Sequence, residues 1–278
     1  MGPPPSNGIL GARRRSDDGE VTRRWRSLLL AASVLLAATP VRGEELAVAA
    51  ASDLKFAMDP LVAAFRKERP DVDVRVSFGA SGSFFAQVSS GAPFDLFLSA
   101  DADYPRRLAD AGLGSAEGVF VYGVGGLVIW VRKGSAADPA RLGPEALLHP
   151  SVQHVAIANP RHAPYGRAAE EALRSLGLWE RLAGRLVLGE NVSQAASFVE
   201  SGAAQAGVFA RSLALSPAMR GKGSWVEVPK ASYRPLVQGG LVLRSAKAPA
   251  AARAFRDFLL GPKGRAILAE YGIAPPAR

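Results

Sequence analysis

The chain has 278 residues, of which 48% are hydrophobic, and it carries a formal net charge of +9 without any cysteine. This length fits one or two domains with a buried core, and the ordinary charged and aromatic content excludes a wholly disordered chain. A sequence without cysteine excludes disulfides, thiolate metal sites, iron–sulfur clusters, a cysteine nucleophile and a lipid-modified cysteine. The excess of basic residues suggests an anionic partner: nucleic acid, a membrane surface or a small anion.

Residues 1–43 have the pattern of a secretory signal peptide. Six arginines between residues 13 and 26 precede an apolar run at residues 28–38, and small residues follow that run. An apolar run of this length is too short to cross a bilayer, although a short membrane anchor is the alternative. The pattern predicts cleavage after Gly43 and export to the periplasm of a Gram-negative bacterium.

The predicted leader changes the meaning of the net charge. It holds seven arginines and three acids, so the remaining 27 basic and 22 acidic residues leave the mature chain near +5. That part contains no run of four or more basic residues, so we expect no nucleic-acid partner. A secreted chain without a lipidation cysteine is expected to be a free monomer in the periplasm.

From residue 45 onward, short apolar strands alternate with amphipathic helices. Strands are expected at residues 46–51, 72–78, 95–99, 119–131, 155–158, 186–188, 206–210 and 239–243. Helices are expected at residues 54–69, 84–89, 104–111, 166–176, 193–200, 249–260 and 264–271. Strand–loop–helix units of this kind predict an α/β fold with a parallel sheet covered on both faces.

The order of these units favours two α/β lobes with a cleft between them. Glycine-rich stretches near residues 121–126 and 236–240 are the candidate crossovers between the lobes. The first lobe is expected to comprise residues 44–122 and 238–278, and the second lobe residues 123–237. Ligands of open α/β sheets bind at the carboxyl ends of strands, so the loops that follow the strands are the places to look for a site.

Two loops of the first lobe carry a serine between a strand and a helix. Ser52 follows residues 46–51, and Ser81 follows the strand at residues 72–78. The free N–H groups and positive dipole end of a helix N-terminus suit an anion, and a serine hydroxyl adds a neutral donor. The alternative is that both serines are ordinary N-caps of their own helices.

Two further strand-to-helix loops lie in the expected second lobe. The first spans residues 159–166 and contains Tyr165, which could present a backbone N–H and a phenolic hydroxyl to a ligand. The second spans residues 189–193. A ligand could therefore be held from both sides of the cleft.

Catalytic motifs are poorly represented. The three histidines lack the spacing of a helical metal pair, and the sequence has neither a Gly-x-Ser-x-Gly elbow nor a phosphate-binding loop of the Walker type. Asp95, Asp101 and Asp103 could ligate a cation, although solvated or capping roles are commoner for such acids. A secreted metal-dependent hydrolase using Asp95 or Asp101 is the remote alternative, and we expect a protein that is not an enzyme and needs no cofactor.

Several motifs resemble one known family. They are residues 49–52 (AAAS), 77–81 (SFGAS), 91–101 (GAPFDLFLSAD), 159–160 (NP), 261–262 (GP) and 271–272 (YG). On these motifs the chain resembles the periplasmic molybdate-binding proteins of ATP-driven transporters over residues 45–275. The resemblance implies a two-lobed type II periplasmic binding fold that holds molybdate or tungstate by neutral hydrogen bonds and delivers it to a membrane permease.

Carried over residue by residue, the resemblance implies four ligand-binding positions. Ser52 and Ser81 match two serines that donate hydroxyl and backbone N–H groups. Tyr165 matches the residue after the second-lobe proline, and Val192 matches a backbone donor at a helix start. The site is therefore expected to bind the oxyanion without any basic side chain.

The sequence departs from the family pattern at two positions. Many members have a tyrosine where this chain has Ala210, and we expect the Tyr165 hydroxyl to replace it. Asp53 is also counted in the site, although its carboxylate would repel a dianion if the carboxylate faced the ligand. In the alternative role, Asp53 is a helix-start acid that offers only its backbone N–H.

The charge of Asp53 bears on which oxyanion is bound. Molybdate, tungstate and sulfate are fully ionised near neutral pH and only accept hydrogen bonds, whereas phosphate keeps a proton and favours a nearby carboxylate. A receptor for sulfate or phosphate is therefore the main alternative. A DNA-binding regulator with this fold is excluded because a leader occupies the place of the helix-turn-helix region.

Overall fold

The computed structural model describes residues 1–2 and 43–276, and the predicted signal peptide falls almost entirely outside the described residues. The described fold begins with strand β1 (Glu44–Ala51), directly after the predicted cleavage position. Among the helices of residues 43–276, none combines the length and the apolar character that crossing a bilayer requires.

The first sheet has five strands in the order β2-β1-β3-β10-β4. Their bounds are β1 (Glu44–Ala51), β2 (Val72–Gly79), β3 (Leu96–Ser99), β4 (Val119–Gly125) and β10 (Leu236–Val242). Strand β1 pairs in parallel with β2 and β3, whereas β10 is antiparallel to both of its neighbours. We call the part of the chain built on this sheet lobe 1.

The second sheet also has five strands, in the order β7-β6-β8-β5-β9, and we call the part built on it lobe 2. Its strands are β5 (Leu127–Arg132), β6 (Val155–Ala158), β7 (Leu186–Gly189), β8 (Ala206–Ala210) and β9 (Gly223–Glu227). Strand β6 is parallel to β7 and β8, and β5 is antiparallel to β8 and β9. The expected parallel sheet is therefore confirmed only for some of the strands, since both sheets are mixed. In each sheet one strand runs against the other four: β10 in lobe 1 and β5 in lobe 2.

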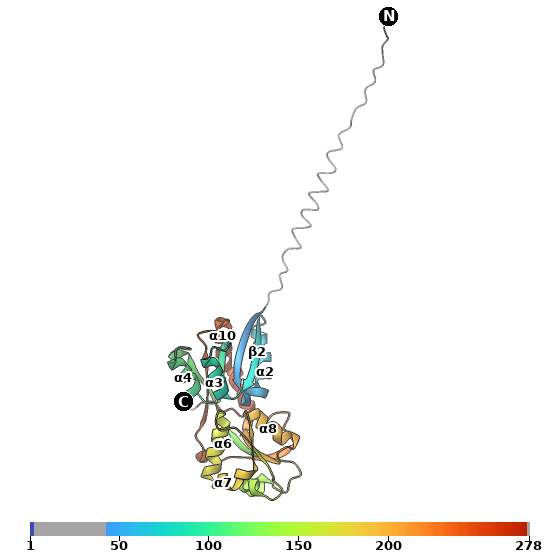
Figure 1. Cartoon of the computed structure of the whole chain (residues 1–278), viewed down its shortest axis with the longest axis vertical. Helices are drawn as coiled ribbons and strands as arrows, with labels where there is room; N and C mark the ends of the chain where they lie inside the picture. Colours follow the sequence, from blue (N-terminus) through green and yellow to red (C-terminus); the bar gives the residue numbers. More distant parts are fainter. Residues whose placement is uncertain (3–42, 277–278) are drawn as a thin grey trace. The chain divides into compact units, whose positions relative to one another are not determined.

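Helices cover both sheets, as Figure 1 shows. Lobe 1 carries α2 (Lys55–Glu68), α3 (Ser81–Ser89), α4 (Asp103–Asp110), α10 (Pro249–Leu260) and α11 (Pro262–Glu270). Lobe 2 carries α5 (Pro139–Leu142), α6 (Pro164–Ser175), α7 (Trp179–Leu182), α8 (Val192–Ser201) and α9 (Arg211–Ala214). Short 3-10 helices are η1 (Ser52–Leu54), η2 (Ala116–Gly118), η3 (Gly143–Leu148), η4 (Ala183–Arg185) and η5 (Lys230–Ser232).

The expected helices are present with ends shifted by a few residues, and so are the expected strands, apart from the strand at 119–131, which the structure divides into β4 and β5. Helix α2 shows why the helical prediction succeeded: Ala57, Met58, Leu61 and Phe65 recur at helical spacing, and all four are buried. The ring of Phe65 packs edge-on against Phe255, with centroids 5.0 Å apart. Strand β9 was not predicted, because its five residues lack an alternating apolar pattern.

The two lobes are joined where the expected strand 119–131 breaks. Strand β4 ends at Gly125 and pairs with β10, whereas β5 starts at Leu127 and pairs with β8 and β9. The chain returns from β9 to β10 through residues 228–235. The expected lobe boundaries at residues 122/123 and 237/238 remain a prediction.

Position 125 requires glycine because the side chains of Tyr165 and Gln238 lie against its backbone. A Cβ there would overlap the Tyr165 hydroxyl and lie 2.9 Å from Gln238 Nε2. Since both groups are buried, neither can move aside without disturbing its own packing.

We therefore expect Gly125→Ala to lower the free energy of unfolding by about 1–3 kcal/mol, through overpacking at the junction. Gly184→Ala is the matched control, because a Cβ at Gly184 meets nothing within 4 Å, and its effect should stay within about 0.5 kcal/mol. Denaturant unfolding of both variants measures the difference. Equal stabilities would contradict the steric role of Gly125.

Candidate functional site

The structure brings all five predicted site residues to one small cavity between the lobes. Ser52, Asp53 and Ser81 line it from lobe 1, and Tyr165 and Val192 line it from lobe 2. The cavity measures about 10 Å³, close to the space that a single water occupies. A larger ligand therefore requires the lobes or their side chains to move apart.

The two serines lie at the carboxyl ends of neighbouring parallel strands. In the register of β1 and β2, Ala51 is opposite Gly79, so Ser52 and Ser81 follow at the same edge of the sheet. Each is the first residue of its helix, and neither η1 nor α3 has a side-chain cap. The alternative that these serines are N-caps is therefore wrong.

The serine hydroxyls are instead held by backbone groups from other segments. Ser81 Oγ accepts a hydrogen bond from the Ala100 N–H at 3.0 Å, and Ser52 Oγ accepts one from the Ser193 N–H at 3.4 Å. Because each hydroxyl acts as an acceptor in these bonds, its own hydrogen stays available to donate.

Lobe 2 presents two helix N-termini to the same cavity. Tyr165 lies in the first turn of α6, after the helix-starting Pro164, and Val192 is the first residue of α8. Asn191 caps α8 through a bond from the Gln194 N–H to Oδ1 at 3.1 Å. Backbone N–H groups in the first turn of a helix have no intrahelical partner, so Val192 is placed to offer one.

A buried polar cluster forms one wall of the site. Gln238 Nε2 donates to Asp53 Oδ2 at 2.5 Å, and the Tyr165 hydroxyl donates to the same oxygen at 3.2 Å. Gln238 Nε2 also lies 3.2 Å from the Tyr165 hydroxyl oxygen. We call these three residues the Asp53 cluster. Sequence analysis missed Gln238, although a lone polar residue in the apolar run of β10 was a usable signal.

The carboxyl group of Asp53 lies deep in the protein, with the residue 1% exposed. Burial raises its pKa to about 7, and the hydrogen bonds from Gln238 and Tyr165 offset only part of this effect. Burial, together with the charge of Asp53, also raises the pKa of Tyr122 and of Tyr165 well above the usual value. The role of a simple helix-start acid does not describe Asp53, since its side chain bonds into the cluster rather than facing solvent.

Other hydrogen bonds join the lobes around the cavity. The Gly82 N–H donates to the His162 carbonyl at 2.9 Å, and Ser212 Oγ donates to the Asp53 carbonyl at 2.7 Å. A Cβ at Gly82 would lie 2.6 Å from that His162 oxygen, so glycine permits the close approach. The cleft is therefore closed in this structure.

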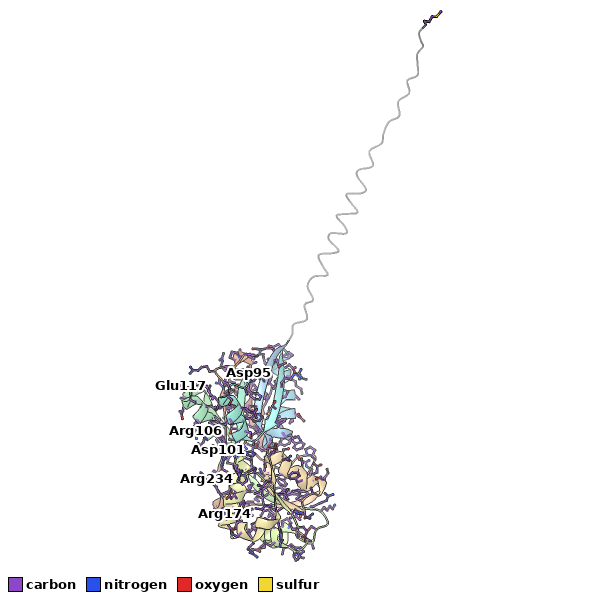
Figure 2. The ribbon with its side chains drawn as sticks, viewed as in Figure 1. Asp95, Asp101, Arg106, Glu117, Arg174 and Arg234 are labelled. Carbon is purple, nitrogen blue, oxygen red and sulfur yellow. The ribbon has the colours of Figure 1, made fainter. Side chains whose placement is uncertain are left out.

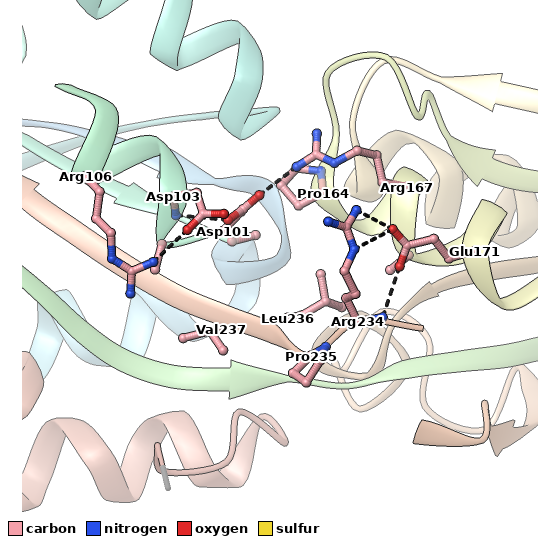
Figure 3. A pocket seen from close by; sticks show the side chains of 13 residues that line it. Asp101, Asp103, Arg106, Pro164, Arg167, Glu171, Arg234, Pro235, Leu236 and Val237 are labelled. Atoms are coloured by element: carbon pink, nitrogen blue, oxygen red, sulfur yellow. Dashed lines mark hydrogen bonds and ion pairs between the residues drawn. The ribbon is translucent and has the colours of Figure 1, made fainter. Parts of the chain in front are cut away.

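A wider depression of about 260 Å³ lies beside the cavity and is rich in arginine (Figure 3). Each arginine in it is ion-paired: Arg106 with Asp103 at 2.6 Å, Arg167 with Asp101 at 2.7 Å, and Arg234 with Glu171 at 2.5 Å. Because these carboxylates neutralise the arginine charges locally, the depression attracts an anion less strongly than its composition suggests. The pair of Arg167 with Asp101 joins lobe 2 to lobe 1.

The acids considered for a cation have structural roles. Asp95 Oδ1 accepts from the Lys247 N–H at 2.6 Å and Oδ2 from the Ala47 N–H at 2.7 Å, which ties β1 to the start of α10. Figure 2 shows Asp95 within lobe 1 and Asp101 near the junction of the lobes. Within residues 43–276, no group of three or more His, Asp or Glu side chains is arranged to hold a metal ion. The hydrolase alternative thus lacks a site in the described part of the chain.

Comparison with known proteins agrees with this architecture. The family model for bacterial extracellular solute-binding proteins matches residues 46–274. The molybdate-binding protein ModA of Rhodobacter capsulatus is 38% identical over 252 residues, covering 90% of this chain and 96% of the relative. ModA of Azotobacter vinelandii is 36% identical over 245 residues, covering 88% and 96%.

Solved structures confirm the expected two-lobed α/β fold. The periplasmic molybdate-binding protein of Azotobacter vinelandii superposes with a TM-score of 0.76 and 33% identity, covering 84% of this chain and all of that one. The sulfate-binding protein SubI of Mycobacterium tuberculosis, at 18% identity and a TM-score of 0.67, shares the fold alone. These are binding proteins, as the sequence predicted, and not enzymes. Because the family model covers most of the chain and relatives above 30% identity cover nearly all of it, the chain belongs to the family of bacterial extracellular solute-binding proteins.

Proposed function

We propose that this protein binds molybdate, and also tungstate, in the cavity between its lobes and delivers it to the permease of an ABC transporter. One observation carries the proposal. The hydroxyl groups of Ser52 and Ser81 do not cap their own helices, and they border one cavity together with two helix N-termini of lobe 2. The names of the relatives at 36–38% identity support molybdate as the ligand. The predicted leader supports action in the periplasm, where we propose that the protein is a free monomer that uses neither nucleic acid nor a cofactor.

The chemistry of the donors suits a fully ionised tetrahedral oxyanion. Such an ion only accepts hydrogen bonds, and the cavity offers hydroxyl groups and backbone N–H groups. The N-termini of α3 and α8 add favourable dipoles toward a negative charge. No arginine or lysine of the described chain lines this cavity, so binding relies on neutral donors.

Closure of the lobes completes the site. Ser52 and Ser81 belong to lobe 1, whereas Tyr165 and Val192 belong to lobe 2, so the full donor set exists only when the lobes meet. A permease can then distinguish the loaded from the empty protein by the distance between the lobes. A receptor for sulfate or phosphate remains the alternative, since these ions use the same donors.

The proposed site is tested by replacing the two serines. We expect the double variant Ser52→Ala with Ser81→Ala to lose at least about a hundredfold in molybdate affinity, because two hydrogen bonds to a charged ligand disappear. Calorimetric titration with molybdate, tungstate, sulfate and phosphate measures this loss and the selectivity.

The matched control carries Ser89→Ala and Ser197→Ala, two exposed serines on α3 and α8. Its affinity should equal that of the unmodified protein. Full molybdate affinity in the Ser52 and Ser81 variant would place the site elsewhere. Binding of sulfate or phosphate but of neither larger oxyanion would replace molybdate by the alternative ligand.

Closure of the lobes is tested by removing one ion pair between them. Arg167→Ala removes an ion pair between the lobes while leaving the cavity lining intact, so we expect molybdate affinity to fall by about three- to tenfold. Arg174→Ala is the control, because Arg174 lies on the same helix and its ion pairs in the described part of the chain are with Glu170 and Glu180 of lobe 2. Equal affinities of the two variants would show that the Arg167 pair does not stabilise the closed form.

A further inference from the structure

Asp53 presents a problem that the proposed function does not solve. It lines the cavity that we assign to a dianion, and an ionised carboxylate there would repel such a ligand strongly at short range. Its Oδ2 accepts a hydrogen bond from each of the other two residues of the Asp53 cluster. Its Oδ1 is buried and has no hydrogen-bond partner among the described residues. Oδ1 is therefore the oxygen of this carboxyl group that can carry a proton or contact a ligand.

We infer that Asp53 binds the oxyanion as a neutral carboxylic acid, so that ligand binding takes up one proton from solution. This inference rests on the proposed function. In the complex, the proton sits on Oδ1 and the resulting O–H donates a hydrogen bond to an oxygen of the ligand. The proton comes from water or buffer, and no other bond is formed or broken.

Within residues 43–276, the groups that face Asp53 do not provide a positive charge that would keep it ionised. Tyr122 from β4, Tyr165 from α6 and Gln238 from β10 are its neutral neighbours. Ser212 from α9 bonds only to its backbone carbonyl. Val192, from α8, completes this side of the cavity with an apolar side chain.

The charged side chains on the neighbouring helices are directed elsewhere. Arg211 of α9 bonds to Glu227 and to the Gly272 carbonyl. Lys55 of α2 is exposed and lies over the Phe56 ring, and Asp59 of the same helix is also exposed.

The free protein is poised for this proton uptake. With its pKa near 7, Asp53 is largely ionised at pH 8 and largely protonated at pH 6. A bound dianion raises the pKa further, because a neighbouring negative charge disfavours the carboxylate. Binding at higher pH must therefore include protonation, and the affinity falls as the pH rises.

The same group gives a signature in the absence of ligand. The pKa of Asp53 is about 7 in the folded protein and about 3.9 in an unfolded chain, so the folded state binds more protons between these values. The free energy of unfolding therefore contains a favourable contribution from Asp53 that is fully present below about pH 4 and is lost as the pH rises to about 7. Asp53→Asn should remove this loss.

The test is calorimetric titration of the protein with sodium molybdate at about pH 6 and about pH 8, in two buffers of different ionisation enthalpy. We expect uptake of about one proton at the higher pH and about tenfold weaker binding there than at the lower pH. Asp53→Asn keeps a neutral donor, so it should bind with no proton uptake and no pH dependence over this range. Asp59→Asn, at an exposed position of α2, should behave like the unmodified protein.

Each outcome decides a separate point. Molybdate binding to the unmodified protein without proton uptake at about pH 8 overturns the inference and leaves the proposed function standing. Phosphate binding without proton uptake, with no binding of molybdate, shows that the ligand brings its own proton, and it overturns both. The proton count needs no variant, so it remains decisive even where Asp53→Asn fails to fold. Failure of every oxyanion to bind overturns the proposed function and, with it, this inference.

Discussion

The hydrogen bonds from Tyr165 and Gln238 to Asp53 Oδ2 are the contacts on which the rest of the site depends. Tyr165 belongs to lobe 2, Asp53 follows the first strand of lobe 1, and Gln238 lies on the strand by which the chain returns to lobe 1. Gly125 makes room for this meeting on the other connection. The Asp53 cluster therefore links the cavity to both segments that join the lobes.

Electrostatics favours the small cavity over the arginine-rich depression as the proposed ligand site. Three arginines gather there, but each is already bonded to a carboxylate, and one of the pairs holds the lobes together. The cavity beside it has fewer charges but better donors, since hydroxyl groups and helix N-termini bind an anion without a competing carboxylate salt bridge. The net charge of +9 is consequently a poor guide to the site, because nearly half of it belongs to the predicted leader.

Much of the fold and the site could be predicted from the sequence, because apolar periodicity and strand-to-helix loops are local signals. Ser52 and Ser81 could be found from their place between strand and helix. Their hydroxyl groups, however, accept hydrogen bonds from the N–H groups of Ala100 and Ser193, which belong to distant segments. The antiparallel β10 could not be predicted, since strand direction follows from how the chain returns between the lobes. For the same reason the burial of Asp53 against Gln238, which is 185 residues away, left no local pattern.

The proposed molybdate site is tested most directly in a crystal grown with sodium molybdate. The anomalous scattering of molybdenum locates the ion in that crystal. We expect a molybdenum site in the cavity, with oxyanion oxygens within hydrogen-bond distance of Ser52 Oγ and Ser81 Oγ. Molybdenum found only in the depression lined by Arg106, Arg167 and Arg234, or nowhere between the lobes, would contradict it.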